Sequence, residues 1–250
     1  MTLVRVPCLF GQVEHAAEPL HDAPALTVAT LGRPWRPPAS GTVDLDERTR
    51  ESIAAYDQNP RAYQEALRRR RPIRDIRRFA ALAGPGARVL DVGCGPASDL
   101  RNLMDVGLHP VGVDLSMGAL LEARLLLPRL ALVRAPFDRL PFRPGSFGGL
   151  WLSAAFVHLP RGLWRETFAR LMEVLDRGPV HFSCVRGMAD LAPVDDPVLG
   201  RVYRSDATED EVEALLTSHG LRDVQIELRP DPFLDRKRMW VVGLGRTAAG

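Results

Sequence analysis

Two spacings of apolar residues alternate along the chain from about residue 88 onward. Short continuous apolar runs predict buried strands, and stretches in which apolar residues recur every three or four positions predict amphipathic helices. Strands and helices that alternate in this way are typical of an α/β fold with a doubly wound, mostly parallel sheet. The predicted strands cover 88–92, 109–114, 130–134, 150–154, 180–185, 224–228 and 239–244, and the predicted helices cover 98–105, 116–127, 161–175 and 208–220.

The last two predicted strands are separated by a long turn, so they should close the sheet as an antiparallel pair. The expected fold is therefore a seven-stranded, mostly parallel sheet with an antiparallel C-terminal strand. Ser116 is expected to N-cap one helix, and Thr208 to N-cap another, with Glu211 in the capping-box position.

The N-terminal third of the chain divides into two parts by composition. Residues 45–84 have a helical pattern and are expected to form a cap on a domain that covers 45–250. The Asn59-Pro60 pair should end one helix and begin the next. Residues 1–44 are expected to form an arm or linker, because six prolines break any long element there: Pro7, Pro19, Pro24, Pro34, Pro37 and Pro38.

Composition narrows the possible classes of protein. A chain of 250 residues, 46% of them hydrophobic, can bury a substantial core, and its net charge of +2 gives no global attraction to nucleic acid or membrane. Cys8, Cys94 and Cys184 show neither metal-ligand spacing nor a framework of disulfide pairs. We therefore expect no bound metal and a location in the reducing cytoplasm. No apolar run reaches 18 residues, which predicts no membrane span.

The candidate chemistry begins where the first predicted strand ends in two glycines, Gly93 and Gly95. Glycine permits a sharp turn and a close approach of backbone to ligand, and the helix that follows offers unpaired N–H groups. Nineteen positions after Gly95, the second strand ends in Asp114. A carboxylate at that distance suits the hydroxyls of a ribose. A dinucleotide fingerprint would need Gly or Ala where Ser98 stands.

The two motifs that carry this pattern are VLDVGCGPASDL and PVGVDLS, in this order. They resemble the first two motifs of class I (Rossmann-like) S-adenosylmethionine-dependent methyltransferases of the small-molecule type. The resemblance implies S-adenosyl-L-methionine as cofactor. It implies that a glycine turn contacts the methionine end of the cofactor and that a carboxylate binds the ribose hydroxyls. One apolar residue is expected beside the adenine ring, and another residue at the opposite edge of that ring. The residues in these roles are Asp91, Gly93, Cys94 and Gly95 for the turn, Asp114 for the ribose, Leu115 beside adenine, and Phe137 or Asp138 at the other edge.

The sequence departs from the family pattern at three positions. Pro136 stands where relatives have the Asp that receives the adenine amino group, and Gly148 replaces another Asp of the same loop. Ala97 replaces the usual third glycine of the first motif, which is expected to be harmless because alanine is small. The change at Pro136 removes a side-chain acceptor and a backbone donor.

The acceptor side is expected at the end of the fourth strand. Ser153, His158 and Tyr56 are predicted to face the transferred methyl group, and His158 is the candidate general base for a hydroxyl or acid acceptor. The alternative is that His158 caps its loop and that Tyr56 and Tyr63 only pack the helical layer. The Asn/Asp-Pro-Pro-aromatic motif of amide and adenine-amino methyltransferases is absent, which argues against those acceptors.

Three acids follow the fifth strand in a predicted loop, which in the resembled family can roof the pocket. Asp190, Asp195 and Asp196 either recognise a cationic acceptor or are solvated loop residues. The first functional hypothesis is thus an enzyme that moves a methyl group to an O, N or C nucleophile of a small molecule.

Two other functions stay open. Seven arginines in 68–78 could contact the phosphates of an RNA, or a protein substrate, although their spacing favours a solvated helix face. The third hypothesis is a degenerate cofactor-binding or interaction protein. The pattern predicts neither the acceptor nor the oligomeric state.

Overall fold

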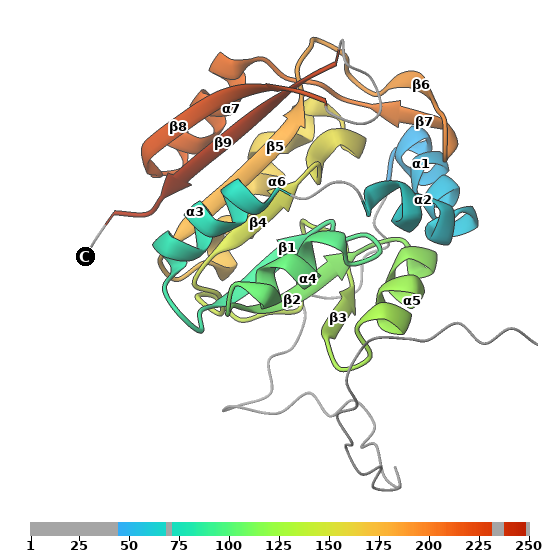
Figure 1. The fold of residues 1–250 in the computed structure, drawn as a ribbon. Helices are drawn as coiled ribbons and strands as arrows, with labels where there is room; N and C mark the ends of the chain where they lie inside the picture. The colour runs from blue at the N-terminus through green and yellow to red at the C-terminus, as the bar shows by residue number, and fades with distance from the viewer. Residues whose placement is uncertain (1–44, 69–71, 232–237, 249–250) are drawn as a thin grey trace, which may run out of the picture. The chain divides into compact units, whose positions relative to one another are not determined.

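The computed structural model describes residues 45–68, 72–231 and 238–248 (Figure 1). All of these belong to the compact unit Pro37–Gly250. The predicted arm 1–44 lies outside the described residues, as does part of the arginine run.

A seven-stranded sheet forms the centre of this unit, in the order β3-β2-β1-β4-β5-β9-β8. Its first five strands are parallel, β9 runs antiparallel to β5, and β8 pairs antiparallel with β9. The predicted fold class, with its antiparallel C-terminal strand, is confirmed. The strands are β1 (Arg88–Val92), β2 (His109–Asp114), β3 (Ala131–Arg134), β4 (Leu150–Ser153), β5 (Pro179–Val185), β8 (Arg222–Pro230) and β9 (Met239–Arg246).

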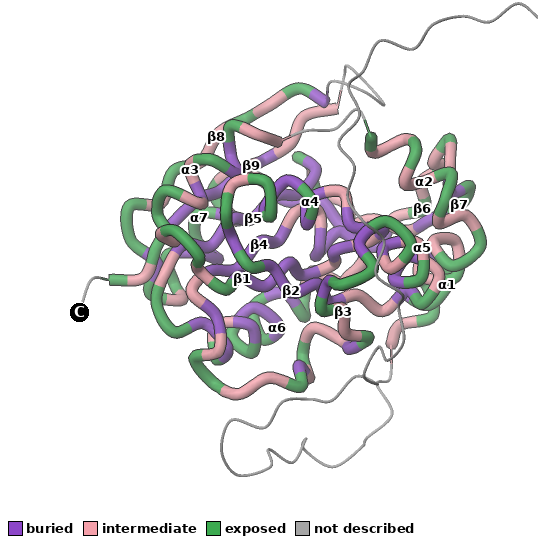
Figure 2. The backbone as a smooth tube through the Cα atoms, turned by 60° about the horizontal axis from the view of Figure 1, so that its bottom comes forward, coloured by how far each residue is buried: buried purple, intermediate pink, exposed green. Residues whose placement is uncertain are grey.

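Helices cover both faces of the sheet (Figure 1). They are α3 (Ile73–Ala83), α4 (Ser98–Asp105) and α5 (Met117–Leu126) on one face, and α6 (Arg161–Val174) and α7 (Glu209–Ser218) on the other. Phe79 of α3 packs with Trp151 of β4, and Phe168 of α6 packs on the opposite side with Phe182 of β5. Figure 2 shows the buried backbone concentrated in the central strands. Thr208 and Glu211 form the predicted capping box of α7, and Ser116 N-caps α5.

The segment after β5 is a hairpin, where the sequence predicted a loop. β6 (Ala192–Asp196) pairs antiparallel with β7 (Gly200–Arg204). Pro193 and the adjacent acids disfavour a strand, but β6 is a short edge strand in a two-stranded sheet, where such residues are tolerated. Asp196 closes the turn, because its Oδ1 accepts the N–H groups of Val198 and Leu199 at 2.9 and 3.0 Å.

Helices α1 (Glu47–Gln58) and α2 (Pro60–Leu67) lie at the carboxyl ends of the parallel strands, next to β7 and α5 (Figure 1). The predicted break at Asn59-Pro60 is confirmed. Ser52 fixes α1 to the hairpin, since its Oγ accepts the Tyr203 N–H at 2.9 Å. Thr49 donates to the backbone oxygen of His158 at 2.8 Å. Helix α1 is therefore held across the edge of the sheet where ligands bind in open α/β folds.

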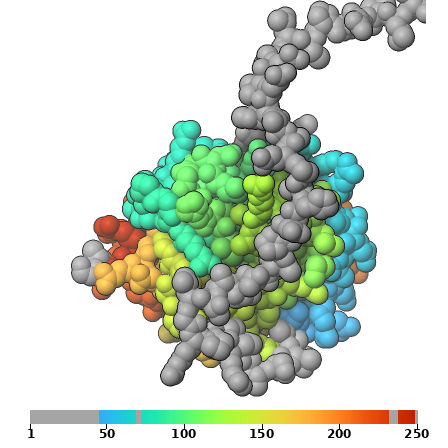
Figure 3. Space-filling view, turned by 90° about the horizontal axis from the view of Figure 1, so that it is seen from below, coloured from blue at the N-terminus to red at the C-terminus, as the bar shows by residue number. Residues whose placement is uncertain are grey.

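Asp57 joins α1 to the start of α5. Its Oδ1 accepts the Ser116 hydroxyl at 2.7 Å and the Gly118 N–H at 2.8 Å, so a residue of one helix caps another. The two backbones also touch, because a Cβ at Gly118 would lie 2.7 Å from the Asp57 carbonyl oxygen. Figure 3 shows the blue surface of α1 beside the green surface of α5.

We expect Asp57→Ala to lower the free energy of unfolding by about 1 kcal/mol, because the first turn of α5 loses a cap. Urea denaturation would measure the change as a lower midpoint at constant slope. Glu51→Ala, at an exposed position of α1, is the matched control. Equal midpoints for the two variants would contradict the capping role.

Candidate functional site

A cavity of about 350 Å³ opens at the carboxyl ends of β1, β2 and β4. We name it the glycine-turn cavity. Its walls come from the β1–α4 turn, the end of β2, the loop after β3, the η1 turn after β4 (Phe156–His158) and helix α1. Residues that line it include Leu45, Thr49, Tyr56, Gly93, Gly95, Asp114, Leu115, Pro136, Phe137, Asp138, Ser153, Ala155 and His158.

The floor of this cavity is the predicted glycine turn. Gly93 and Gly95 have φ angles of +70° and +52°, which only glycine adopts without strain. A Cβ at Gly93 would lie 3.2 Å from the Cα of Ala155, so the turn and the η1 segment are closely packed. Ala97 has φ +71° as well. The alanine at the third glycine position therefore adopts a left-handed conformation that costs alanine more than glycine, and its expected lack of effect on the cofactor site stays a prediction.

Asp114 ties the end of β2 to both neighbouring turns. Its Oδ2 accepts the Gly95 N–H at 2.9 Å and its Oδ1 accepts the Ser116 N–H at 2.8 Å. Burial raises the pKa of this carboxyl, although the backbone donors act in the opposite direction. The carboxylate is thus fixed in orientation at the cavity wall, with further lone pairs for hydroxyl donors.

The structure brings most of the predicted cofactor residues together. Leu115, Phe137, Asp138 and Ser153 join Gly93, Gly95 and Asp114 around one cavity, and Pro136 lines the same wall. Asp91 and Cys94 are buried beneath the turn and are not among the lining residues.

The Cys94 side chain points into the core instead of the cavity. A Cβ at Gly112 would lie 2.8 Å from its sulfur, and Cys94 packs with Leu100 and Ala123 between α4 and α5. Burial raises the pKa of its thiol well above the ordinary value. Its side chain therefore acts as packing, and only its backbone belongs to the turn, where its N–H donates to the Val113 oxygen at 3.1 Å.

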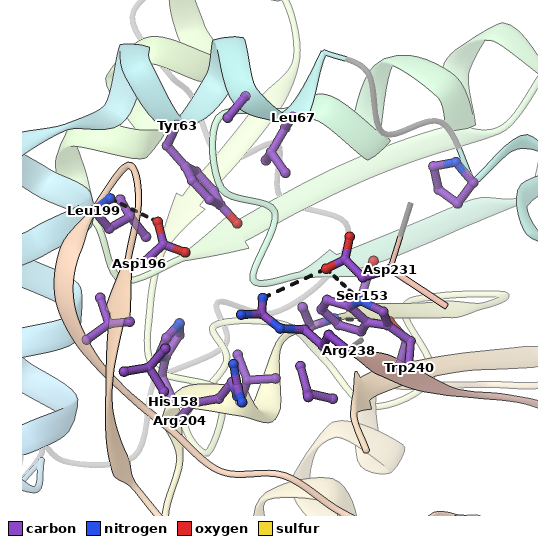
Figure 4. Close-up of a pocket in the computed structure, with 18 of the residues that line it drawn as sticks. Tyr63, Leu67, Ser153, His158, Asp196, Leu199, Arg204, Asp231, Arg238 and Trp240 are labelled. Atoms are coloured by element: carbon purple, nitrogen blue, oxygen red, sulfur yellow. Dashed lines mark hydrogen bonds and ion pairs between the residues drawn. The ribbon is translucent and has the colours of Figure 1, made fainter. Parts of the chain in front are cut away.

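A second cavity of about 370 Å³ lies beside the first, under the β6–β7 hairpin (Figure 4). We name it the hairpin cavity. Its lining is mostly apolar, with valines from β5, β6, β7 and β9, and with Leu67, Leu199 and Trp240. The two cavities share five lining residues: Tyr56, Tyr63, Ser153, Ala154 and His158.

Tyr56 and His158 form a hydrogen-bonded pair in that shared wall. The Tyr56 hydroxyl lies 2.8 Å from His158 Nε2, and His158 Nδ1 lies 2.7 Å from the Tyr203 carbonyl oxygen. A carbonyl only accepts, so Nδ1 carries the proton and the neutral Nε2 accepts from Tyr56. Burial lowers the pKa of His158 and raises that of Tyr56 well above its ordinary value. Both effects favour a neutral ring with its lone pair on Nε2.

The three predicted loop acids have different positions. Asp190 accepts the Arg161 N–H at 2.8 Å and serves the local fold, Asp195 is exposed, and Asp196 lines the hairpin cavity. Five charged lining residues were missed in the sequence: Asp75, Arg204, Arg229, Asp231 and Arg238. Asp75 and Arg229 pair across 154 positions, so the sequence gave no local signal for that pair. Asp231 pairs with Arg238, and Arg204 with Asp206, over short separations, but nothing in the sequence placed them at a cavity.

Within the described ranges, no helix has the length and apolar character needed to cross a membrane. In the same residues, no three His, Cys, Asp or Glu side chains gather as metal ligands would.

Comparison with known proteins identifies the region that contains the glycine turn. Residues 89–178 match the sequence profile of a family described as methyltransferase domain. A demethylmenaquinone methyltransferase of Beutenbergia cavernae is 39% identical over 71 residues, which are 28% of this chain and 30% of that protein. A 24-methylenesterol C-methyltransferase 2 of Oryza sativa is 26% identical over 186 residues, 66% of this chain and 51% of that protein. The matches thus span about half or less of these curated relatives.

A solved structure resembles the chain over most of its length. The 1,6-didemethyltoxoflavin-N1-methyltransferase of Burkholderia thailandensis, crystallised with 1,6-didemethyltoxoflavin and S-adenosylhomocysteine, superposes with a TM-score of 0.65 at 20% identity. The superposition covers 85% of this chain and 94% of that one. A methyltransferase from Mesorhizobium loti gives a TM-score of 0.52 at 21% identity, over 69% of this chain and 96% of that one.

Proposed function

We propose that this chain, which carries a class I methyltransferase domain, is an S-adenosylmethionine-dependent enzyme that methylates a small molecule. One observation carries the proposal. The glycine-turn cavity and the hairpin cavity meet at a shared wall that contains a hydrogen-bonded tyrosine and histidine. Such a pair of cavities gives separate places to a methyl donor and a methyl acceptor, with the polar groups where the two would meet.

The glycine-turn cavity fits a nucleoside with an amino-acid tail. Gly93 leaves no room for a side chain between the turn and Ala155, so backbone reaches the ligand directly. Asp114 would hold the ribose hydroxyls, while Leu115 and Phe137 would flank the adenine, with Asp138 at its edge. Pro136 leaves the recognition of the adenine amino group to these neighbours. The bound cofactor supplies a methyl group on a sulfonium, which needs no covalent enzyme intermediate.

His158 and Tyr56 are the proposed catalytic residues. A hydroxyl or amine in the hairpin cavity would donate its proton to the Tyr56 oxygen while Tyr56 passes its own proton to Nε2 of His158. Tyr203 holds the ring in the orientation that this transfer needs. The apolar lining disfavours water at the junction of the two cavities. Holding donor and acceptor in the reactive geometry can lower the activation barrier by up to about 7–11 kcal/mol.

Small-molecule acceptors are supported by the relatives, whose names refer to a menaquinone precursor, a sterol and a toxoflavin precursor. The mostly apolar hairpin cavity agrees with acceptors of that class. Among the described arginines of the basic run, Arg74 and Arg78 bind Glu227 at 3.2 and 2.6 Å, which favours a role in the fold over nucleic-acid binding. A cytoplasmic location stays a prediction, supported by the free, buried thiols of Cys94 and Cys184.

Isothermal calorimetry tests the proposal directly. We expect S-adenosylmethionine and S-adenosylhomocysteine to bind at one site per chain, and NAD, the ligand of the alternative Rossmann class, to bind far more weakly. A panel of phenols, quinols and amines, assayed for S-adenosylhomocysteine formation, then identifies the acceptor. Binding of neither adenosyl compound would overturn the enzymatic function, and binding without turnover would leave the degenerate protein as the better description.

A further inference from the structure

The charged side chains around the hairpin cavity are almost all paired with one another. The buried Asp75 binds the Arg229 guanidinium. Arg204 binds the buried Asp206 at 2.7 Å. Asp231 binds Arg238 at 3.8 Å and accepts the Trp240 Nε1–H at 3.3 Å. Within the described part of the chain, Asp196 is the one acid of this lining that forms no ion pair.

Among the described residues, the contacts that fix the Asp196 side chain are two backbone N–H groups. Its Oδ1 takes the two N–H groups of Val198 and Leu199, which orients the carboxylate at the tip of the hairpin. Figure 4 shows Asp196 and Tyr63 directed into the same space. The charge of Asp196 also acts on the shared wall, where it adds to the effect of burial on the pKa of Tyr56 and opposes the effect of burial on the pKa of His158.

The half-buried carboxylate of Asp196 faces mostly apolar walls, where a charge is less well solvated than in water, so a cation in that space is favoured as its partner. The rings of Tyr56, Tyr63 and Trp240, which line the same cavity, suit a cation as well, since aromatic faces attract positive charge.

We infer that Asp196 selects an acceptor that carries a positively charged nitrogen on an apolar body. The inference rests on the proposed function, because it assigns the hairpin cavity to the acceptor. A protonated or quaternary nitrogen has no lone pair to attack a methyl group. The charged nitrogen is therefore the recognition group, and a separate hydroxyl or amine of the same molecule faces Tyr56.

The probes are phenylpropylamine, phenylpropanol and phenylpropanoate, which share a skeleton and are cationic, neutral and anionic at neutral pH. Calorimetry is performed on the full chain, both free and with S-adenosylhomocysteine. We expect the amine to bind about tenfold more tightly than the alcohol, and the carboxylate to bind weakest.

Asp196→Asn is the informative variant, because its amide oxygen still accepts from Val198 and Leu199 while the charge is removed. It should abolish the preference for the amine over the alcohol. Asp195→Asn is the matched control, since Asp195 is the exposed neighbour on the same strand, and it should leave the preference unchanged.

Several results would overturn the inference. One is tightest binding of the carboxylate, which would assign recognition to Arg238. A second is an Asp196→Asn variant that keeps the amine preference, or that changes only the ratio of S-adenosylmethionine to S-adenosylhomocysteine binding, which would assign Asp196 to the sulfonium. A third is that no probe binds. Failure of both adenosyl compounds to bind contradicts the proposed function separately, and the amine preference of the free chain still tests Asp196.

Discussion

Asp114→Ala is expected to raise the dissociation constant of S-adenosylmethionine about 100-fold. The carboxylate is proposed to accept two ribose hydroxyls, and hydrogen bonds to a charged group contribute about 1.5–3 kcal/mol each. A total loss of about 3 kcal/mol corresponds to that factor. Calorimetric titration of the variant against the wild type measures the change.

The variant also removes the acceptor for the Gly95 and Ser116 N–H groups, so its fold must be compared. Asp114→Asn separates the two effects, because an amide oxygen still accepts one of these N–H groups while the charge is lost. We expect it to weaken cofactor binding to an intermediate extent. Asp105→Asn, at an exposed position of α4, should bind like the wild type. An Asp114→Ala protein that is folded and binds normally would contradict the ribose assignment.

The second large effect is expected at His158. His158→Asn should lower kcat at least about 100-fold, as removal of a general base does, with cofactor affinity changed by less than about threefold. The asparagine amide can still donate to the Tyr203 carbonyl, so the turn is preserved while Nε2 is lost. Tyr56→Phe should show a similar loss.

If the two residues form one proton relay, the double variant should be little slower than either single one. Additive losses would show that they act separately. The assay uses the acceptor that the panel identifies, at saturating cofactor.

The pH profile gives an independent check of this role. The proposed base is the neutral ring of His158, and burial holds the pKa of His158 below its ordinary value of 6.5. Activity should therefore be constant around neutral pH and fall only as the pH drops through that lowered value. This fall of activity at low pH should be absent from the pH profile of His158→Asn. A limb centred above 6.5 would contradict the neutral pair.

The glycine turn and Asp114 could be predicted because their signal is local. Gly93, Gly95 and Asp114 occur at the ends of two clear strands, and parallel strands bring those ends together whatever the rest of the chain does. The fold class followed from the same alternation of strand and helix. Tyr56 was named from the resemblance and His158 from its position after the fourth predicted strand, and the structure brings the two side chains within 2.8 Å.

The hairpin cavity could not be predicted, because its parts are distant in the chain. Asp75 and Arg229 are 154 positions apart, and nothing near either residue indicates the pairing. The direction of the Cys94 side chain could not be predicted either. Hydrophobic periodicity predicts which face a side chain occupies in a strand or a helix, but not in a turn. The hairpin itself has weak strand propensity at Pro193 and the adjacent acids, and its stability comes from contacts with α1.

The two cavities draw on different stretches of the chain. The described residues that line the glycine-turn cavity all lie between Leu45 and Thr167, whereas most of those that line the hairpin cavity come after residue 178, beyond the matched methyltransferase region. If the hairpin cavity holds the acceptor, as proposed, substitutions in the C-terminal third should change which molecules are methylated more than they change cofactor binding. On that proposal, directed evolution of new specificities should concentrate its libraries on the hairpin and the β8–β9 ends.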